Sequence, residues 1–422
     1  MELKPGYKQT EVGVIPEDWE IISLGDIFTF KNGLNKGKEY FGHGTPIVNY
    51  MDVYKKPNIY VNDLTGRVAV NPQEIKNYEV RKGDMFFTRT SETVEEIGMA
   101  AVVLDNPTNT VFSGFILRAR PKNDYLDNTF KAYCFSSEQV RRAIRLKSSY
   151  TTRALTNGRL LSSVVIPIPP LAEQRAIATA LSDMDALLAA QDQLIAKKRD
   201  IKQAVMQQLL TGKQRLPGFS GEWEVKRLGE IGEIAGAGID KKIRPNEVSV
   251  RLVNYLDVYR KDFITSQDLH HFVTATPIQA SRCRVRKGDV FFTPSSEVRD
   301  DIAHSAVAME NIPDAVYSYH VIRLRPSDDW DLRFRAYAFK TKRFFDQAHM
   351  LCDGSGTRYV ISQGKFRAMT VLVPPIPEQS SIAAVLSDID AEIDALQQRR
   401  DKTQMLKQGM MQELLTGRTR LV

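Results

Sequence analysis

The chain has 422 residues, 42% of them hydrophobic and 26% charged, with a formal net charge of +7. This length allows roughly two to four domains, and Cys134, Cys283 and Cys352 lie too far apart for a disulfide framework or a cysteine zinc site. The chain has no apolar run of the roughly 18–20 residues that a membrane helix needs and no signal-peptide pattern, so we expect a cytoplasmic protein without a membrane contact.

Residues 1–168 are predicted to form a first α+β globule that is rich in strands. Val111–Arg118 is dense in β-branched and aromatic residues, which is typical of a strand. Lys82–Asp84 is a turn signal before another apolar strand. Phe130–Leu146 has the spacing of an amphipathic helix.

Residues 169–212 are predicted to hold one long helix, about 170–211, that follows this globule. Pro169 and Pro170 end the preceding strand, and proline is tolerated in the first turn of a helix. Glu173 suits the positive end of the helix dipole, and Gly212 suits the C-cap.

The same series then returns 205 residues later, which indicates a duplicated unit. A second globule is predicted at 213–373, with a strand at Val316–Arg323 and an amphipathic helix at Phe334–Met350. A second long helix with a C-terminal tail is predicted at 374–422. The clearest matching segments are Val48–Tyr54 with Val253–Tyr259, Val80–Asp84 with Val285–Asp289, Pro169–Gln174 with Pro374–Gln379, and Leu209–Gly212 with Leu414–Gly417. Duplicated units usually lie about a pseudo-twofold axis, so the function is expected to use that symmetry.

The two long helices are predicted to pair as an antiparallel coiled coil. A helix of about 42 residues spans ~60 Å, well beyond the ~30 Å of a small domain. The second helix is the obvious partner, and a twofold axis perpendicular to the pair makes it antiparallel. Apolar residues with coiled-coil spacing mark the seam: Ile177, Leu181, Met184, Leu188, Ile195, Val205 and Leu209 in the first helix, and Ile382, Leu386, Ile389, Ile393, Leu396, Met410 and Leu414 in the second.

The middle of this seam is polar. The residues concerned are Gln191, Lys198 and Lys202 in the first helix and Arg400, Thr403 and Lys407 in the second. They indicate either a poorly packed stretch or polar contacts that fix the register. The sequence leaves both interpretations open.

Motifs for catalysis or for a cofactor are missing. Gly33–Glu39 lacks the spacing of a P-loop, and Gly236–Gly238 is too short for a dinucleotide-binding turn. Asn106–Thr108 lacks the second proline and the aromatic residue of an adenine-methylase motif. The six histidines show no metal-ligand spacing. We therefore expect no catalytic site, no metal and no cofactor in this chain.

Two globules, each followed by a helix that begins with Pro-Pro-x-x-Glu-Gln and ends with Leu-Leu-Thr-Gly, resemble the DNA-specificity subunit of type I restriction-modification enzymes. The opening Tyr7–Trp19 is also similar to the N-terminal signature of that family. Each short motif is weak alone, but their doubled occurrence in a fixed order is specific, and the resemblance covers essentially the whole chain.

The resemblance implies a non-catalytic, sequence-specific DNA-binding subunit. Each globule would be a target-recognition domain that reads one half of a bipartite, asymmetric site in double-stranded DNA. The helices would set the spacing and dock two methyltransferase subunits, which would bring S-adenosylmethionine. Motor-nuclease (restriction) subunits could join, and ATP and Mg would bind to these partners.

Three loops in each copy are the candidate DNA contacts, because they pair a similar framework with different side chains. The first loop holds Asn35, Lys36 and Lys38, against Asp240, Lys241, Lys242 and Arg244; the second holds Arg89, Thr90 and Ser91, against Ser295 and Ser296; the third holds Tyr150, Thr152 and Arg153, against Ser355, Thr357 and Arg358. The cations that both copies retain, Lys36/Lys241 and Arg153/Arg358, are expected to hold phosphates, and the positions that differ to read bases. The net positive charge is compatible with this, although many proteins have such a charge without binding nucleic acid.

Two other functions stay open at this point. A coiled-coil scaffold with two protein-binding domains would show no salt-dependent affinity for DNA. A self-sufficient DNA enzyme would need a cofactor motif that the sequence does not contain.

Overall fold

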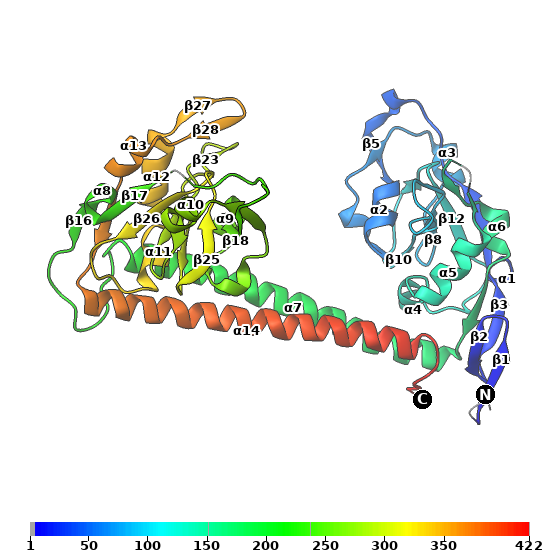
Figure 1. Ribbon diagram of the computed structural model, residues 1–422. Coiled ribbons are helices and arrows are strands. Elements are labelled where there is room, and N and C mark those ends of the chain that lie inside the picture. Colours follow the sequence, from blue (N-terminus) through cyan, green and yellow to red (C-terminus); the bar gives the residue numbers. More distant parts are fainter. Residues whose placement is uncertain (1–4, 151, 237, 422) are drawn as a thin grey trace. The chain divides into compact units, whose positions relative to one another are not determined.

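The computed structural model describes residues 5–150, 152–236 and 238–421 (Figure 1). The chain divides into two compact units: unit 1 contains Met1–Asp192 and Arg399–Val422, and unit 2 contains Gln193–Gln398. Each unit therefore holds one globule and a part of both long helices, α7 (Leu171–Leu209) and α14 (Ile376–Leu414). The four-part division made from the sequence stays a prediction.

The core of unit 1 is a five-stranded sheet in the order β4-β12-β8-β10-β6. Its central strand, β8, and the neighbouring strand β10 are buried on both faces, which their continuous apolar sequences favour. The strands are β4 (Phe28–Asn32), β6 (Asn58–Ile59), β8 (Met85–Thr88), β10 (Ala100–Val103) and β12 (Ile116–Pro121).

Smaller sheets and short helices surround this core sheet. The sheets are β1 (Tyr7–Thr10) with β2 (Gly13–Pro16), β3 (Glu20–Ser23) with β15 (Val165–Ile168), β5 (Phe41–Val48) with β7 (Arg67–Val68) and β11 (Val111–Phe112), and β9 (Thr90–Ser91) with β14 (Ala154–Leu155) and β13 (Ser149–Tyr150). The helices are α1 (Leu24–Ile27), α2 (Tyr50–Lys55), α3 (Pro72–Asn77), α4 (Asn128–Cys134), α5 (Glu138–Lys147) and α6 (Gly158–Ser162), with 3-10 turns at Lys38–Tyr40 and Val61–Asp63.

Unit 2 repeats this arrangement. Its core sheet has the order β17-β26-β22-β24-β19, and its strands are β17 (Gly232–Ala235), β19 (Phe263–Ile264), β22 (Val290–Phe292), β24 (Ser305–Ala308) and β26 (Ile322–Pro326). The smaller sheets are β16 (Glu224–Arg227) with β29 (Thr370–Val373), β20 (Phe272–Ala275) with β18 (Val248–Val253), β25 (Ile312–Tyr317) and β21 (Arg284–Val285), and β23 (Ser295–Ser296) with β28 (Arg358–Val360) and β27 (Asp353–Ser355). The helices are α8 (Leu228–Ile231), α9 (Tyr255–Arg260), α10 (Pro277–Arg282), α11 (Phe334–Ala338), α12 (Lys342–Leu351) and α13 (Gln363–Ala368), with a 3-10 turn at Ser266–Asp268.

The strands predicted at 111–118 and 316–323 are each broken by a turn. In unit 1, Ser113 accepts the N–H of Phe115 on its hydroxyl at 3.3 Å and the N–H of Ile116 on its carbonyl at 3.1 Å. Serine commonly stabilises turns in this way. The chain therefore leaves β11 and enters β12 in a different sheet, and Ser318 makes the equivalent break in unit 2.

The helices predicted at 130–146 and 334–350 are each two helices. The hydroxyl of Ser137 accepts the N–H of Val140 and begins α5, and the hydroxyl of Thr341 accepts the N–H of Phe344 and begins α12. A serine or threonine cap within an apolar pattern was the signal for this break, because it stabilises a new helix start.

The antiparallel pairing of α7 with α14 is visible within each unit. In unit 1, Asp185 pairs with Lys407 at 2.5 Å and Asp192 pairs with Arg400 at 3.0 Å. Residue numbers therefore rise along α7 as they fall along α14, which makes the two helices antiparallel. In unit 2, Lys198 pairs with Glu392 and Lys202 with Asp390, both at 2.5 Å. The predicted α+β class, with two tandem repeats and an antiparallel helix pair, is confirmed.

The polar stretch of the seam is well paired in the structure. Besides these ion pairs, Gln191 donates from its Nε2 to the Thr403 hydroxyl at 3.2 Å, although its Oε1 has no hydrogen-bond partner. Specific polar contacts such as these favour the interpretation that the stretch fixes the register. The predicted seam residues are buried, except Met184, Val205, Ile389, Leu396 and Met410, which are half-buried.

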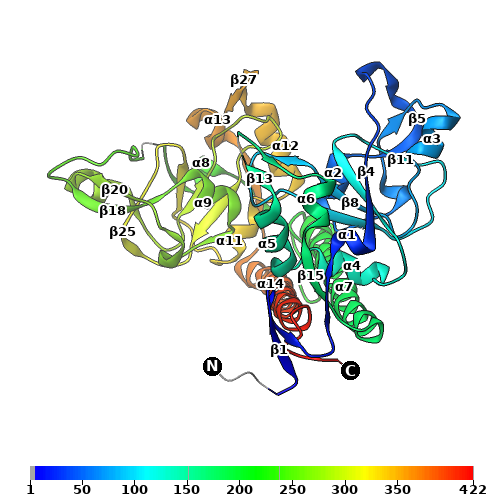
Figure 2. The same cartoon turned by 90° about the vertical axis from the view of Figure 1, so that its right-hand side faces the viewer.

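The Pro-Pro-x-x-Glu-Gln motif ties each helix to its globule. In unit 1, the buried Glu173 carboxylate accepts the indole N–H of Trp19 at 2.9 Å and the guanidinium of Arg420 at 2.5 and 2.8 Å. Gln174 accepts the N–H of Asp127 at 2.9 Å. The hairpin β1–β2 lies beside the end of α14, where Tyr7 donates from its hydroxyl to the Gly417 carbonyl at 2.9 Å (Figure 2).

Unit 2 forms the same set of contacts with equivalent residues. The buried Glu378 carboxylate accepts the guanidinium of Arg215 at 2.5 and 2.6 Å and the indole N–H of Trp223 at 3.0 Å. In both units the arginine follows the end of one long helix and the glutamate begins the other. The doubled motifs therefore have a structural purpose, since they close each unit around both helices.

Candidate nucleic-acid interface

The second and third predicted loops form one small sheet in each unit. In unit 1, Thr90 pairs with Leu155 and Ser91 with Ala154 in the sheet β13-β14-β9. In unit 2, Ser295 pairs with Val360 in the sheet β23-β28-β27. Residues more than 50 positions apart in the sequence are thus brought together twice in the same way.

Arg153 lies at a polar cleft of about 320 Å³ beside this sheet in unit 1. Its guanidinium is exposed, and it forms no ion pair with any residue that the structure describes. Tyr50 and Tyr54 line the same cleft with their rings stacked at 5.8 Å, and Tyr50 donates from its hydroxyl to the Thr90 carbonyl at 3.3 Å. Glu92 and Glu96 also line this cleft, and the exposed Arg153 is the side chain there that is suited to contact with a phosphate.

The second-loop arginine has a structural contact instead. Arg89 is half-buried and donates from Nη1 to the Gly114 carbonyl at 2.9 Å. Ser91 is buried and donates to Glu96 at 3.3 Å, whereas Thr90 and Tyr150 are exposed. In unit 2, Ser295 and Ser296 are half-buried, and Ser355, Thr357 and Arg358 are exposed. Thr152 and Arg153 of unit 1 are exposed as well.

The first loop of unit 1 holds a cation that the fold itself uses. Lys36 pairs with Glu74 at 2.8 Å and donates to the Ala69 carbonyl at 2.9 Å, and its ammonium lies 4.6 Å from the centre of the Tyr40 ring. The Lys36 ammonium lowers the pKa of Glu74. Lys36 is therefore a weaker candidate for phosphate binding than its neighbour Lys38, which is exposed, as is Asn35.

In unit 2 the paired and unpaired cations are arranged differently. Arg244 pairs with Asp240 at 2.6 Å, which lowers the pKa of the aspartate. Lys241 and Lys242 are exposed. Neither Lys241 nor Arg358 has an ion-pair partner among residues 193–236 and 238–398. Free cations of this kind are the ones available to an incoming polyanion.

The turns at Gly114–Phe115 and Tyr319–His320 are exposed features that the sequence interpretation missed. Phe115 is 72% exposed and Tyr319 is 50% exposed. Burial and the charges of Lys241 and Arg358 lower the pKa of His320. The signal that could have found the unit 1 turn is the pair Ser113-Gly114 inside an apolar run.

A second missed feature is an exposed apolar row on α7. Leu187, Leu194 and Ile201 are between 41 and 43% exposed and lie seven residues apart. This is coiled-coil spacing on a side of the helix other than the predicted seam. On α14, Met405 and Leu406 are also exposed, at 62 and 59%.

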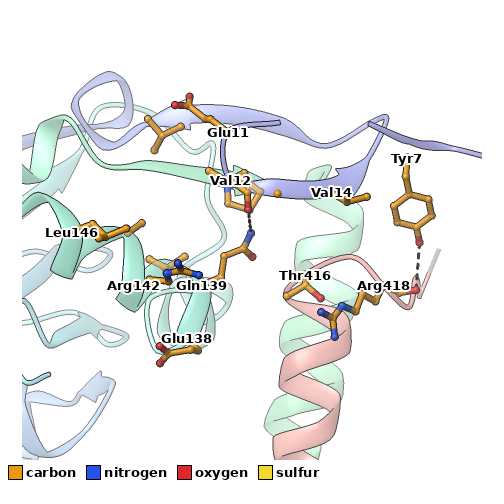
Figure 3. Close-up of a pocket in the computed structure, with 15 residues that line it drawn as sticks. Tyr7, Glu11, Val12, Val14, Glu138, Gln139, Arg142, Leu146, Thr416 and Arg418 are labelled. Atoms are coloured by element: carbon orange, nitrogen blue, oxygen red, sulfur yellow. Dashed lines mark hydrogen bonds between the residues drawn. The ribbon is translucent and has the colours of Figure 1, made fainter. Parts of the chain in front are cut away.

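Unit 1 also has a groove of about 900 Å³ between its terminal hairpin and α5 (Figure 3). Val12 and Val14 of the hairpin, Leu146 of α5 and Thr416 after α14 line it. Gln139 spans one side by donating from Nε2 to the Val12 carbonyl at 3.1 Å. Two acidic residues, Glu11 and Glu138, and two basic residues, Arg142 and Arg418, also line the groove, so it has no excess of positive charge for a phosphate backbone.

Two kinds of site are absent from the part of the chain that the structure describes. No three histidine, cysteine or acidic side chains come close enough to hold a metal ion. None of the helices has both the length and the apolar character to cross a membrane.

Comparisons with known proteins give one consistent result. The family model described as the type I restriction modification DNA specificity domain matches residues 16–197 and 220–404. The type I restriction enzyme MjaVIII specificity subunit of Methanocaldococcus jannaschii is 21% identical, over 96% of this chain and 94% of that protein. The EcoKI specificity subunit of Escherichia coli K12 is 22% identical, over 96% of this chain and 89% of that protein.

Solved structures show the same fold. The HsdS subunit from Thermoanaerobacter tengcongensis has a TM-score of 0.53 and 17% identity, over 96% of this chain and 98% of that chain. A chain from a study of complex assembly and conformational transition of the type I R-M system has a TM-score of 0.62 and 16% identity, over 96% of this chain and 99% of that chain. The two family matches and these neighbours agree with the resemblance stated from the motifs. The chain belongs to the type I restriction-modification DNA specificity family, whose DNA specificity domain it contains twice.

Proposed function

We propose that each unit reads one half of a bipartite, asymmetric site in double-stranded DNA, and that the two long helices set the gap between the halves. The helices also dock two methyltransferase subunits, which carry S-adenosylmethionine. Motor-nuclease subunits that use ATP and Mg join the same complex and cut unmodified DNA.

One observation carries the proposal: the two units share a framework and differ in the side chains that it exposes. The sheet of the second and third loops has the same pairing in both units, yet one exposes Thr90 and Tyr150 and the other exposes Ser355 and Thr357. Base readout depends on such donors and acceptors, whereas the framework only positions them. Two similar readers with different surfaces are suited to two different half-sites.

Docking of the partner subunits is supported by the exposed row Leu187, Leu194 and Ile201. Apolar side chains repeated at seven residues on an exposed helix face are normally covered by another helix. Because α7 contributes residues to both units, a partner helix on this row also bears on the spacing of the two readers.

Adding charge to this row is expected to weaken methyltransferase binding. The double variant Leu187→Lys/Leu194→Lys should bind the methyltransferase subunit at least ten-fold more weakly, since burying a lysine without a partner is costly. The matched control is Ala189→Lys/Ala196→Lys, which adds the same charge two residues further along at positions that are also exposed. Sedimentation of the mixed subunits measures the difference, and equal weakening by both variants would contradict the docking proposal.

DNA binding by the assembled complex tests the proposed function as a whole. The chain is co-expressed with the methyltransferase subunit encoded beside it, and DNA affinity is measured over a range of salt concentrations. The proposal predicts that the complex binds tightly to DNA that contains the sequence it methylates. The affinity should fall steeply as the salt concentration rises. A scaffold with two protein-binding domains would instead show no salt-dependent affinity, even with its partners present. Binding of S-adenosylmethionine by the isolated chain would contradict the placement of that cofactor on the partner.

A further inference from the structure

We propose that the two equivalent turns, Gly114–Phe115 in unit 1 and Tyr319–His320 in unit 2, insert into a DNA groove and contact bases directly. This inference rests on the proposed function, since it assigns the readers a base-contacting element that the predicted loops do not include.

The turns have the same backbone in both units. In unit 1, Leu34 forms a bridge with Ser113 and accepts the N–H of Gly114 at 2.8 Å. In unit 2, Ile239 forms a bridge with Ser318 and accepts the N–H of Tyr319 at 3.1 Å. A framework that fixes the backbone and leaves the next side chains outside is what a recognition element requires.

The unit 1 turn offers an apolar ring. Phe115 is 72% exposed, and its ring has no aromatic or cationic partner among the residues that the structure describes. The Gly114 carbonyl already accepts from Arg89, and its N–H is bonded to Leu34, so the turn backbone has little left to offer a ligand. An exposed phenyl ring can contact the thymine methyl group in the major groove or wedge between base pairs.

Gly114 brings a polar neighbour to this ring. A Cβ atom at this position would clash with the Oδ1 atom of Asn35, so the asparagine side chain packs directly on the glycine. Asn35 is exposed and belongs to the first predicted loop. An asparagine amide matches the donor and acceptor pair on the adenine edge. Phe115 and Asn35 together form a surface suited to an A·T base pair.

The unit 2 turn offers hydrogen bonds and nearby charge. Tyr319 is 50% exposed, and its ring lies 3.9 Å from that of His320. Burial and the charges of Lys241 and Arg358 lower the pKa of His320, so its imidazole is neutral near pH 7 and has one donor and one acceptor nitrogen. The two cations can hold the adjacent phosphates. The equivalent turns therefore present different chemistry to the two halves of the site.

Substitution of Phe115 tests the inference against a matched control. Phe115→Ala is compared with Leu146→Ala, which removes an apolar side chain of 74% exposure from α5 of the same unit. Each variant is assembled with the methyltransferase, and adenine methylation is mapped across a genome. Phe115→Ala should relax sequence preference at one or two adjacent base pairs of one half-site and weaken binding roughly ten-fold. Leu146→Ala should match the wild-type complex, and Tyr319→Ala/His320→Ala should alter the other half-site.

The outcomes separate the inference from the function on which it rests. If the wild-type and Leu146→Ala complexes methylate one bipartite site and Phe115→Ala gives the same map and affinity, the turn does not contact bases. If the wild-type complex shows no bipartite pattern, the proposed function itself is wrong. Replacing thymine by uracil in the affected half-site then identifies the contact. A loss for the wild type but not for Phe115→Ala shows a methyl contact, whereas an unchanged affinity excludes a methyl contact and favours a wedge between base pairs.

Discussion

Replacing Glu378 by alanine is expected to lower the free energy of unfolding of unit 2 by about 1–3 kcal/mol, because it removes the buried acceptor of a partly exposed arginine and of an indole N–H. The Glu378 carboxylate is completely buried and accepts hydrogen bonds from Arg215 and Trp223. Without it, the guanidinium and the indole N–H lose their shared acceptor in the place where α14 begins. Glu173→Ala should have the same effect on unit 1 through Arg420 and Trp19.

Denaturant unfolding, followed by hydrogen exchange that resolves peptides of each unit, measures this effect. The control in unit 2 is Glu224→Ala, which removes a 71% exposed carboxylate that pairs with Lys226 at 3.2 Å. Exposed pairs contribute between about 0 and 1 kcal/mol, so this variant should remain close to the wild type. Equal losses from Glu378→Ala and Glu224→Ala would contradict the structural importance of the motif.

Removing Arg153 and Arg358 together is expected to weaken DNA binding by roughly 100-fold at low salt, since a hydrogen bond to a charged group contributes about 1.5–3 kcal/mol. Both side chains are exposed, and neither is paired with a carboxylate among the described residues. Each is expected to replace about one counterion on the duplex. The slope of log affinity against log salt concentration should therefore fall in magnitude by about two.

The sequence preference of the double variant should remain unchanged, because phosphate contacts do not distinguish bases. The control is Arg142→Ala/Arg343→Ala, which removes the same charge from exposed positions on α5 and α12. Salt-dependent binding and methylation mapping on the same complexes give the two required readouts. A changed preference with an unchanged slope would show that the two arginines read bases instead.

Much of the fold could be predicted because the same signals occur twice. Pro169–Gln174 and Leu209–Gly212 bound α7, and their copies bound α14, within about two residues of the predicted ends. The predicted helices at 130–146 and 334–350 failed because Ser137 and Thr341 interrupt an otherwise continuous apolar pattern. The periodicity reports which face is buried, and it does not report a cap at which one helix ends and another begins.

The candidate site could be predicted only in outline. Loop positions followed from the repeat, but the partners of each cation depend on contacts that are distant in sequence. Lys36 and Lys241 are equivalent in sequence, yet among the described residues only Lys36 has an ion-pair partner, which is Glu74 from another element. The exposure of Phe115 was not predicted, because an aromatic residue in an apolar run indicates a buried strand and not an exposed turn.

Exchange of one reader for a copy of the other tests the central claim most directly. In one chimera residues 224–373 are replaced by residues 20–168, and in a second the exchange is reversed, so that each exchanged segment carries both strands of its terminal sheet. Each chimera is assembled with the methyltransferase, and adenine methylation is mapped. The account predicts a site with two identical half-sites in inverted orientation, separated by the wild-type gap. The account would be contradicted if the half-site of the replaced reader were still methylated. It would also be contradicted if the gap between the half-sites changed while both helices are intact.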